Sequence, residues 1–122
     1  MLPAESGCTA LAAILEVFDG DRAAVDELLA AALHTFGESL DRIELASGET
    51  DRDAIAQSAH RLKGAAATVG GTRVAAVSSL IERAAREGQP IAPSLLIECR
   101  EAVTALNSEI HGFLSTASAG NG

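Results

Sequence analysis

The chain has 122 residues, a formal net charge of −8 and only 2% aromatic residues. A chain of this length can bury one hydrophobic core without a metal ion or a disulfide, which predicts a single domain over residues 1–122. Its acidic balance argues against a nucleic-acid partner, because the phosphate backbone selects basic surfaces. No apolar run reaches the roughly 18 residues of a membrane span, and no signal-peptide pattern opens the chain. We therefore expect a cytoplasmic protein without a membrane partner.

The first half of the chain predicts two helices. Residues 1–8 read as an N-terminal tail, and Thr9 can cap a short helix over residues 9–18. A long helix is predicted from Arg22 to Ala46, because apolar residues recur there every three or four positions. Its predicted buried face consists of Val25, Leu28, Leu29, Ala32, Phe36, Leu40 and Ile43.

Three further helices are predicted downstream. Thr50 or Asp51 can cap the first, which glycines at positions 70 and 71 end. Thr72 can cap the second, and Pro93 opens the last, since proline suits a first helical position. The inward positions predicted for these helices are Ile55, Ala59, Leu62, Ala66 and Val69, then Val74, Val77, Leu80, Ile81 and Ala84, then Leu95, Cys99, Val103, Leu106, Ile110 and Phe113.

These elements predict an all-α fold. Short connections between long amphipathic helices favour antiparallel neighbours. We expect an up-down-up-down four-helix bundle over residues 21–114, with the short N-terminal helix packed at one end and a flexible tail over residues 115–122. A monomer is expected, because one bundle accounts for every apolar stripe.

His60 is the candidate functional residue. On a helix it points away from the apolar stripe, and its predicted surface neighbours are Ala56, Gln57, Gly64 and Ala67. An exposed helical face normally carries long, solvated side chains. The small residues around His60 therefore indicate that another protein approaches the imidazole closely.

Reversible phosphorylation is the chemistry that fits this pattern. A neutral imidazole is a nucleophile that can hold a phosphoryl group covalently. Lys63, at i+3, can offset the charge of that group, and Gly64, at i+4, removes the side chain that would cover the ring. A glycine inside a helix costs about 1 kcal/mol relative to alanine. Residues that disfavour their own helix in this way are typical of functional sites. Gln57 can hydrogen-bond a phosphoryl oxygen, although a plain solvated glutamine fits equally well.

The sequence Ala-His-Arg-Leu-Lys-Gly over residues 59–64, followed by Gly70, resembles the signature of histidine-containing phosphotransfer (HPt) domains. The resemblance is strongest over residues 50–88. It implies that His60 accepts a phosphoryl group from, or donates one to, the aspartate of a response-regulator receiver domain. It also implies that Lys63 balances the phosphoryl charge and that Gly64 marks the approach position.

The family resemblance also implies partners. The receiver domain would supply the catalytic carboxylates and Mg²⁺, so this chain would be a phosphocarrier without a cofactor or metal of its own, rather than an enzyme. A response-regulator receiver domain, a hybrid sensor histidine kinase, or both, are the expected partners. The N-terminal domains of chemotaxis kinases share a similar His-x-x-Lys-Gly pattern. Met1 and the C-terminal tail favour a complete small protein.

Several residues are expected to form the docking surface around His60. Arg61 and Arg73, together with Lys63, are expected to cluster there and steer an acidic partner, although ordinary solvated charges fit as well. The full set expected at the partner interface is Gly64, Ala67, Ala56, Arg61, Arg73, Leu11 and Leu15. Leu11 and Leu15 belong to it only through the family resemblance.

The sequence fits other functions less well than it fits a phosphorelay. His34 and His111 lack a lysine at i+3 and a glycine at i+4, so both read as structural or neutral. A di-iron bundle needs Glu-x-x-His pairs, and none of the three histidines has a glutamate three positions earlier. The chain has no Walker-type phosphate loop and no Gly-x-Ser-x-Gly motif. The alternative left open is an HPt-like docking module that regulates a receiver or kinase without carrying phosphate.

Overall fold

The computed structural model describes residues 14, 16–49 and 51–121, and within them the chain forms four helices and no strand. The helices are α2 (Arg22–Glu49), α3 (Arg52–Thr68), α4 (Thr72–Arg86) and α5 (Pro93–Asn121). No helix in the described part is long and apolar enough to cross a membrane.

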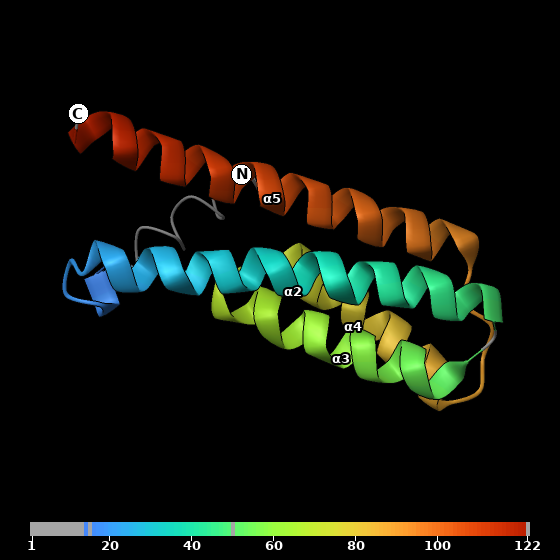
Figure 1. Ribbon diagram of the computed structural model, residues 1–122. Helices are drawn as coiled ribbons and strands as arrows, with labels where there is room; N and C mark the ends of the chain where they lie inside the picture. Colours follow the sequence, from blue (N-terminus) through green and yellow to red (C-terminus); the bar gives the residue numbers. More distant parts are fainter. Residues whose placement is uncertain (1–13, 15, 50, 122) are drawn as a thin grey trace.

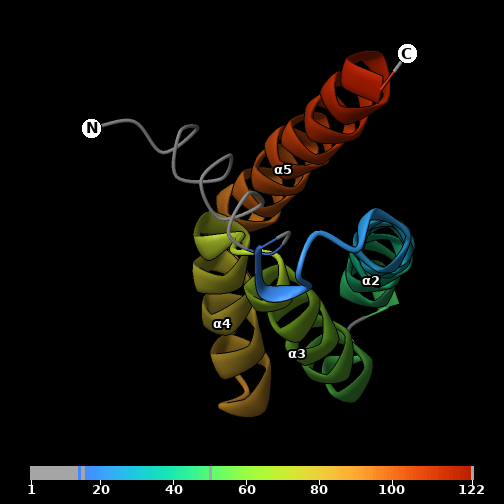
Figure 2. The ribbon, with the colours of Figure 1, turned by 90° about the vertical axis from the view of Figure 1, so that its left-hand side faces the viewer.

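The helices form an up-and-down bundle. Each helix packs against the next one in the chain, and α5 closes the ring by packing against α2. Figure 1 shows α2 and α5 as the two long helices, with the shorter α3 and α4 lying beneath one half of α2. Viewed from the end, α3 and α4 are close neighbours (Figure 2). In the side view of Figure 1, α5 slants away from α2 toward its C-terminus. The predicted four-helix fold is confirmed.

The hydrophobic core lies between the four helices and draws side chains from all of them. The largest fully buried side chains are Phe36, Leu29 and Ile43 of α2, Leu62 of α3, Ile81 of α4 and Ile110 of α5. Burying a side chain of this size contributes about 1.5–3 kcal/mol. The core therefore fixes the rotation of α3 and α4 about their axes, and with it the direction in which their polar side chains point.

Both ends of α3 follow the local signals in the sequence. Asp51 is its N-cap, and its carboxylate accepts a hydrogen bond from the Ala54 N–H at 3.1 Å. At the other end Gly70 has a φ of 76°, which favours glycine, and the Gly71 N–H donates to Ala66 O at 2.7 Å. A Cβ atom at Gly71 would lie 2.5 Å from the Leu106 side chain. Two glycines thus make the tight turn that sets α4 directly beside α3.

Some predicted details are wrong. Thr72 does not cap α4; Gly71 occupies that position, without a side-chain hydrogen bond. Leu80 is 50% exposed instead of buried, because the inward face of α4 runs through Val74, Ser78, Ile81 and Ala85, and Leu80 lies about 100° around the helix from Ile81. Leu28, Ala84, Leu95 and Phe113 are only half-buried. α5 continues to Asn121, beyond the predicted end near residue 114.

The predicted N-terminal helix lies mostly outside the described residues. Residues 14 and 16–18 are described, and Ile14 and Phe18 are half-buried against the core. Leu11 and Leu15, expected at the docking surface, fall outside the described part of the chain.

Candidate functional site

His60 lies in the middle of α3, and its side chain is 65% exposed. The residues beneath it, Ala59 and Leu62, are completely buried. Because these apolar neighbours hold α3 against the core, the imidazole is held on the outside of the bundle. The exposure predicted for His60 is therefore observed.

Most of the small residues predicted around His60 are exposed as expected. Gly64 and Ala67 are exposed, and a Cβ atom at Gly64 would meet nothing within 4 Å. The fold itself therefore does not require a glycine at position 64. Gln57 is exposed, but Ala56 is only 4% exposed and cannot form part of a docking surface. Ala56 is buried because α3 packs against both α2 and α4, so its buried face is wider than one stripe.

Glu82 of α4 reaches His60 across the α3–α4 pair. Its Oε2 atom lies 3.1 Å from His60 Nδ1, and the glutamate is only 9% exposed. A carboxylate can only accept hydrogen bonds, so Nδ1 is the protonated nitrogen that donates to it. In the neutral imidazole, Nε2 is then the nitrogen that carries the lone pair.

Two cations complete the cluster. Lys63 Nζ lies 2.9 Å from Glu82 Oε1. Arg86, one turn after Glu82 on α4, places both Nε and Nη2 at 2.9 Å from Oε2. The hydrogen bond from Lys63 and, next among the stabilising contacts, that from Arg86 outweigh burial and lower the pKa of Glu82 to about 2. Glu82 is consequently a carboxylate throughout the physiological pH range.

Sequence reasoning missed Glu82 and Arg86. The signal was present, because Glu82 follows the buried Ile81 directly and lies one turn after the buried Ser78. Polar residues on the inward side of a helix need partners, since an unpaired buried charge is costly. Recognising that the partner is His60 requires the pairing of α3 with α4, which the sequence pattern does not specify by itself.

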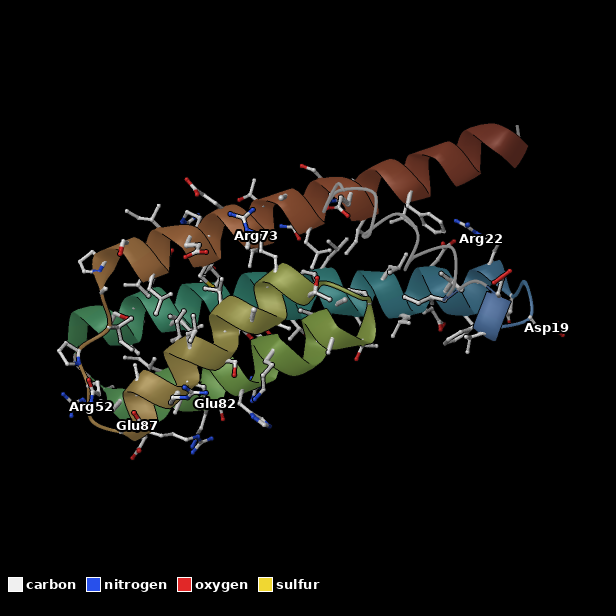
Figure 3. All side chains as sticks on the ribbon, turned by 180° about the vertical axis from the view of Figure 1, so that it is seen from behind. Asp19, Arg22, Arg52, Arg73, Glu82 and Glu87 are labelled. Atoms are coloured by element: carbon white, nitrogen blue, oxygen red, sulfur yellow. The ribbon has the colours of Figure 1, made fainter. Side chains whose placement is uncertain are left out.

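Arg61 and Arg73 are not brought together. Arg61 is exposed on α3, next to His60 in the chain. Arg73 lies nine residues before Glu82 on α4, which corresponds to about 13 Å along the axis and half a turn around it. Figure 3 shows Glu82 on the side of α4 that faces α3, and Arg73 on the side toward α5. The predicted cluster of Arg61, Lys63 and Arg73 does not form; Arg86 takes the place assigned to Arg73.

The surface charge is divided between the two halves of the bundle. The chain has nine Lys and Arg residues. Six of them lie on α3 and α4, where only Asp53 and Glu82 oppose them, whereas residues 22–48 of α2 hold two basic and five acidic residues. The six are Arg52, Arg61, Lys63, Arg73, Arg83 and Arg86. An acidic protein thus presents its basic residues on the two helices that form the His60 site.

A groove of about 520 Å³ runs between α2 and α3 beside this site. Gln57, one turn before His60, and Arg61, next to it in the chain, line the groove from α3. From α2 it is lined by Glu38, Asp41, Arg42 and Leu45. Leu45 is 63% exposed, so its apolar side chain is accessible from the groove. The groove therefore combines an apolar side chain with polar, basic and acidic ones next to the histidine.

The other two histidines lack this setting. His34 Nε2 lies 3.3 Å from Glu38 Oε2 on the same helix, and both side chains are well exposed. His111 is exposed on α5. Within the described residues neither forms an ion pair across two helices, so the network around His60 distinguishes it from the others.

Comparison with known proteins decides the family. The family model described as "Hpt domain" matches residues 27–109, which include α3, α4 and the complete His60 cluster. The chain is a member of the Hpt domain family. Hpt domains are phosphocarriers of two-component signalling rather than catalysts, and they interact with receiver domains and histidine kinases.

A solved structure supports the fold. Histidine-containing phosphotransfer protein B (HptB) from Pseudomonas aeruginosa superimposes with a TM-score of 0.76 at 23% sequence identity. The match covers 85% of this chain and 89% of HptB. At this identity the similarity extends to the Hpt fold alone. None of the curated proteins compared with the chain matches it significantly.

Proposed function

We propose that His60 is the phosphorylated residue of this Hpt domain and that it exchanges a phosphoryl group with the aspartate of a receiver domain. The hydrogen bond between His60 Nδ1 and Glu82 Oε2 carries this proposal. It leaves Nε2 as the nucleophilic nitrogen of an exposed ring. Lys63 lies nearby, and the exposed surface next to the ring carries the small residues Gly64 and Ala67. No comparable arrangement surrounds the other histidines of the described chain.

The transfer step follows from this arrangement. The lone pair of Nε2 attacks the phosphorus of the receiver's aspartyl phosphate, and a P–N bond forms. The P–O bond to the aspartate breaks, and its electron pair leaves with the carboxylate. The ring acquires positive charge, which the Nδ1–H···Glu82 hydrogen bond stabilises, so no proton has to leave. The reverse reaction returns the phosphoryl group to an aspartate and restores the neutral imidazole.

Lys63 is proposed to balance the charge of the phosphoryl group. It lies on the same helix face as His60, one turn further on, and is only partly exposed. Gln57, one turn earlier, is proposed to hydrogen-bond a phosphoryl oxygen. Both side chains flank the ring along α3, so either can reach a group attached to Nε2 without a change in the backbone.

The receiver is proposed to bring the catalytic carboxylates and Mg²⁺. The only carboxylate in contact with His60 is Glu82, within the described residues, and both of its oxygens already bind cationic side chains. A divalent cation prefers oxygen ligands that are not so occupied, and three positive or proton-donating groups disfavour it. The donor set around His60 therefore does not fit Mg²⁺, and no step here depends on a metal held by this chain.

The docking surface is proposed to extend from His60 over Gly64 and Ala67 and into the groove lined by Leu45, Gln57 and Arg61. Small residues permit close approach at the ring, and Leu45 offers an apolar contact to one side. The basic residues nearest His60 on α3, Arg61 and Lys63, would steer the acidic active site of a receiver toward this surface.

The proposal is tested with a panel of receiver domains phosphorylated beforehand, mixed with the wild type and with His60→Gln in the presence of Mg²⁺. An acid-labile, base-stable phosphate mapped to His60 by mass spectrometry, and absent from the variant, is expected. His34→Gln is the matched control and should be labelled as the wild type is. Binding without label in every pair would instead favour the docking module that carries no phosphate.

A further inference from the structure

The two oxygens of Glu82 are used unequally. Oε1 contacts Lys63 alone, whereas Oε2 receives His60 Nδ1 and two nitrogens of Arg86. Lys63 therefore can leave Glu82 without disturbing the contact that orients the histidine. Arg86 cannot, because it shares an oxygen with the imidazole.

The two cations also differ in how firmly they are held. Arg86 and Glu82 lie one turn apart on α4, and the planar guanidinium makes two contacts with a single oxygen. Lys63 comes from the other helix and makes one contact through a flexible four-carbon stem. Lys63 also lies one turn from His60 on α3, so of the two it is placed to follow a group attached to the ring.

If Lys63 moved away from Glu82, the buried carboxylate would lose one of its two counter-charges. The glutamate is 9% exposed, and a carboxylate so little hydrated needs an opposite charge. Before phosphorylation two cations compensate one carboxylate. A phosphoryl group on Nε2 adds about two negative charges, and Lys63 can serve it only if another cation stays on Glu82.

We propose that Arg86 is a positioning residue that holds Glu82 while Lys63 moves from Oε1 to the phosphoryl group on His60. Arg86 does not touch the phosphoryl group; it acts through Glu82 by making Lys63 available. Without Arg86, Lys63 remains on Glu82 and the phosphoryl group loses its counter-charge. This inference rests on the proposed phosphorylation of His60.

The experiment uses phosphoramidate, a small donor that requires no partner protein. Wild type, Arg86→Gln, Arg86→Lys and Arg83→Gln are compared. Arg83 is the matched control: it is an exposed arginine of the same helix that forms no ion pair with Glu82 among the described residues. Two quantities are measured: the rate of His60 phosphorylation, and the NMR shift of the Lys63 ammonium group before and after it.

In the wild type and in Arg83→Gln, the Lys63 signal should move on phosphorylation. In Arg86→Gln it should stay in place, and the phosphorylation rate should fall on the order of tenfold, the value of one charge-assisted contact. Arg86→Lys should restore both the Lys63 response and most of the rate, because it keeps a cation beside Oε2.

The failures of the two proposals are distinguishable. Absence of phosphate on His60 in the wild type, with phosphate on another residue, overturns the proposed function. Normal phosphorylation with a Lys63 signal that does not move overturns the inference and leaves the carrier function intact. Equal slowing by Arg86→Gln and Arg83→Gln also overturns it, because the effect would then be one of net charge.

Discussion

His60 Nδ1 on α3 lies 3.1 Å from Glu82 Oε2 on α4, a residue that follows it by 22 positions in the chain. The contact depends on the two-glycine turn after α3, which sets the two helices side by side. It also depends on the core, because the buried Leu62 and Ile81 fix the direction of each helix face. The sequence motif around His60 therefore forms the complete site only when α4 packs against α3 and brings Glu82 to the imidazole.

Replacing Glu82 should slow the phosphorylation of His60, by an amount that depends on the new side chain. Glu82→Gln keeps an oxygen that accepts from Nδ1 but loses the charge, so phosphorylation should slow about tenfold. Glu82→Ala removes the acceptor as well and should slow it further. The rate constant for transfer from a phosphorylated receiver measures both. Glu87→Gln, an exposed glutamate at the C-cap of α4, is the control; an alanine variant at position 82 as fast as this control would contradict the role of Glu82.

The same carboxylate should make stability depend on pH. The pKa of Glu82 is lowered from 4.5 to about 2 in the folded protein, chiefly by the Lys63 hydrogen bond. A lowered pKa stabilises the fold above the unfolded value, and this contribution is lost as the pH falls from about 4.5 to about 2. The difference in unfolding free energy between wild type and Glu82→Gln should be about 1–2 kcal/mol at pH 7 and shrink across that window. Urea unfolding at several pH values measures it; a difference that stays constant would contradict the ion-pair network.

We expect the glycine at position 64 to lower the stability of the fold while leaving room for a receiver domain to approach His60. A Cβ atom at Gly64 or at Gly37, a second glycine inside a helix, would meet nothing within 4 Å. Alanine at either position should therefore stabilise the protein by up to about 1 kcal/mol, as denaturant unfolding would show. Gly64→Gln should slow transfer from a receiver much more than transfer from phosphoramidate, whereas Gly37→Gln should change neither. Equal receiver transfer by both glutamine variants would show that position 64 is not an approach site.

Leu45 should contribute to receiver binding without affecting the histidine. It lines the groove beside Gln57 and Arg61, and it is 63% exposed. Leu45→Asp should weaken receiver binding, measured by calorimetry, about tenfold or more, as expected for an apolar contact at an interface. Ile97→Asp, a similarly exposed residue on α5, should leave binding unchanged. If the two variants weakened binding equally, the groove would not be the docking surface.

Local signals predicted α3 well. The Asp51 cap, the terminating glycines and the exposure of His60 all depend on residues within one or two turns of one another, and all were visible in the sequence. The pattern on α4 was less informative. Apolarity assigned Leu80 and Ala84 to its inward face, whereas the fold buries Ser78 and Ala85 there and places Glu82 at the edge of that face.

The part of the site that was missed depends on how helices rotate against each other. Packing against two helices widens the buried face of α3, which buries Ala56 and could not be inferred from a single stripe. The pairing of His60 with Glu82, and the distance between Arg73 and the site, follow from the rotation and alignment of α4. Both properties are set by side-chain packing across the whole bundle.

The central claim is that His60 carries the phosphoryl group on Nε2 while Nδ1 remains bonded to Glu82. It is tested most directly by NMR of the protein with ¹⁵N-labelled histidines after transfer from a phosphorylated receiver. Phosphorus coupling to His60 Nε2, with a protonated Nδ1, is the predicted result. Coupling to Nδ1 of His60, or phosphorus on His34 or His111, would contradict the account.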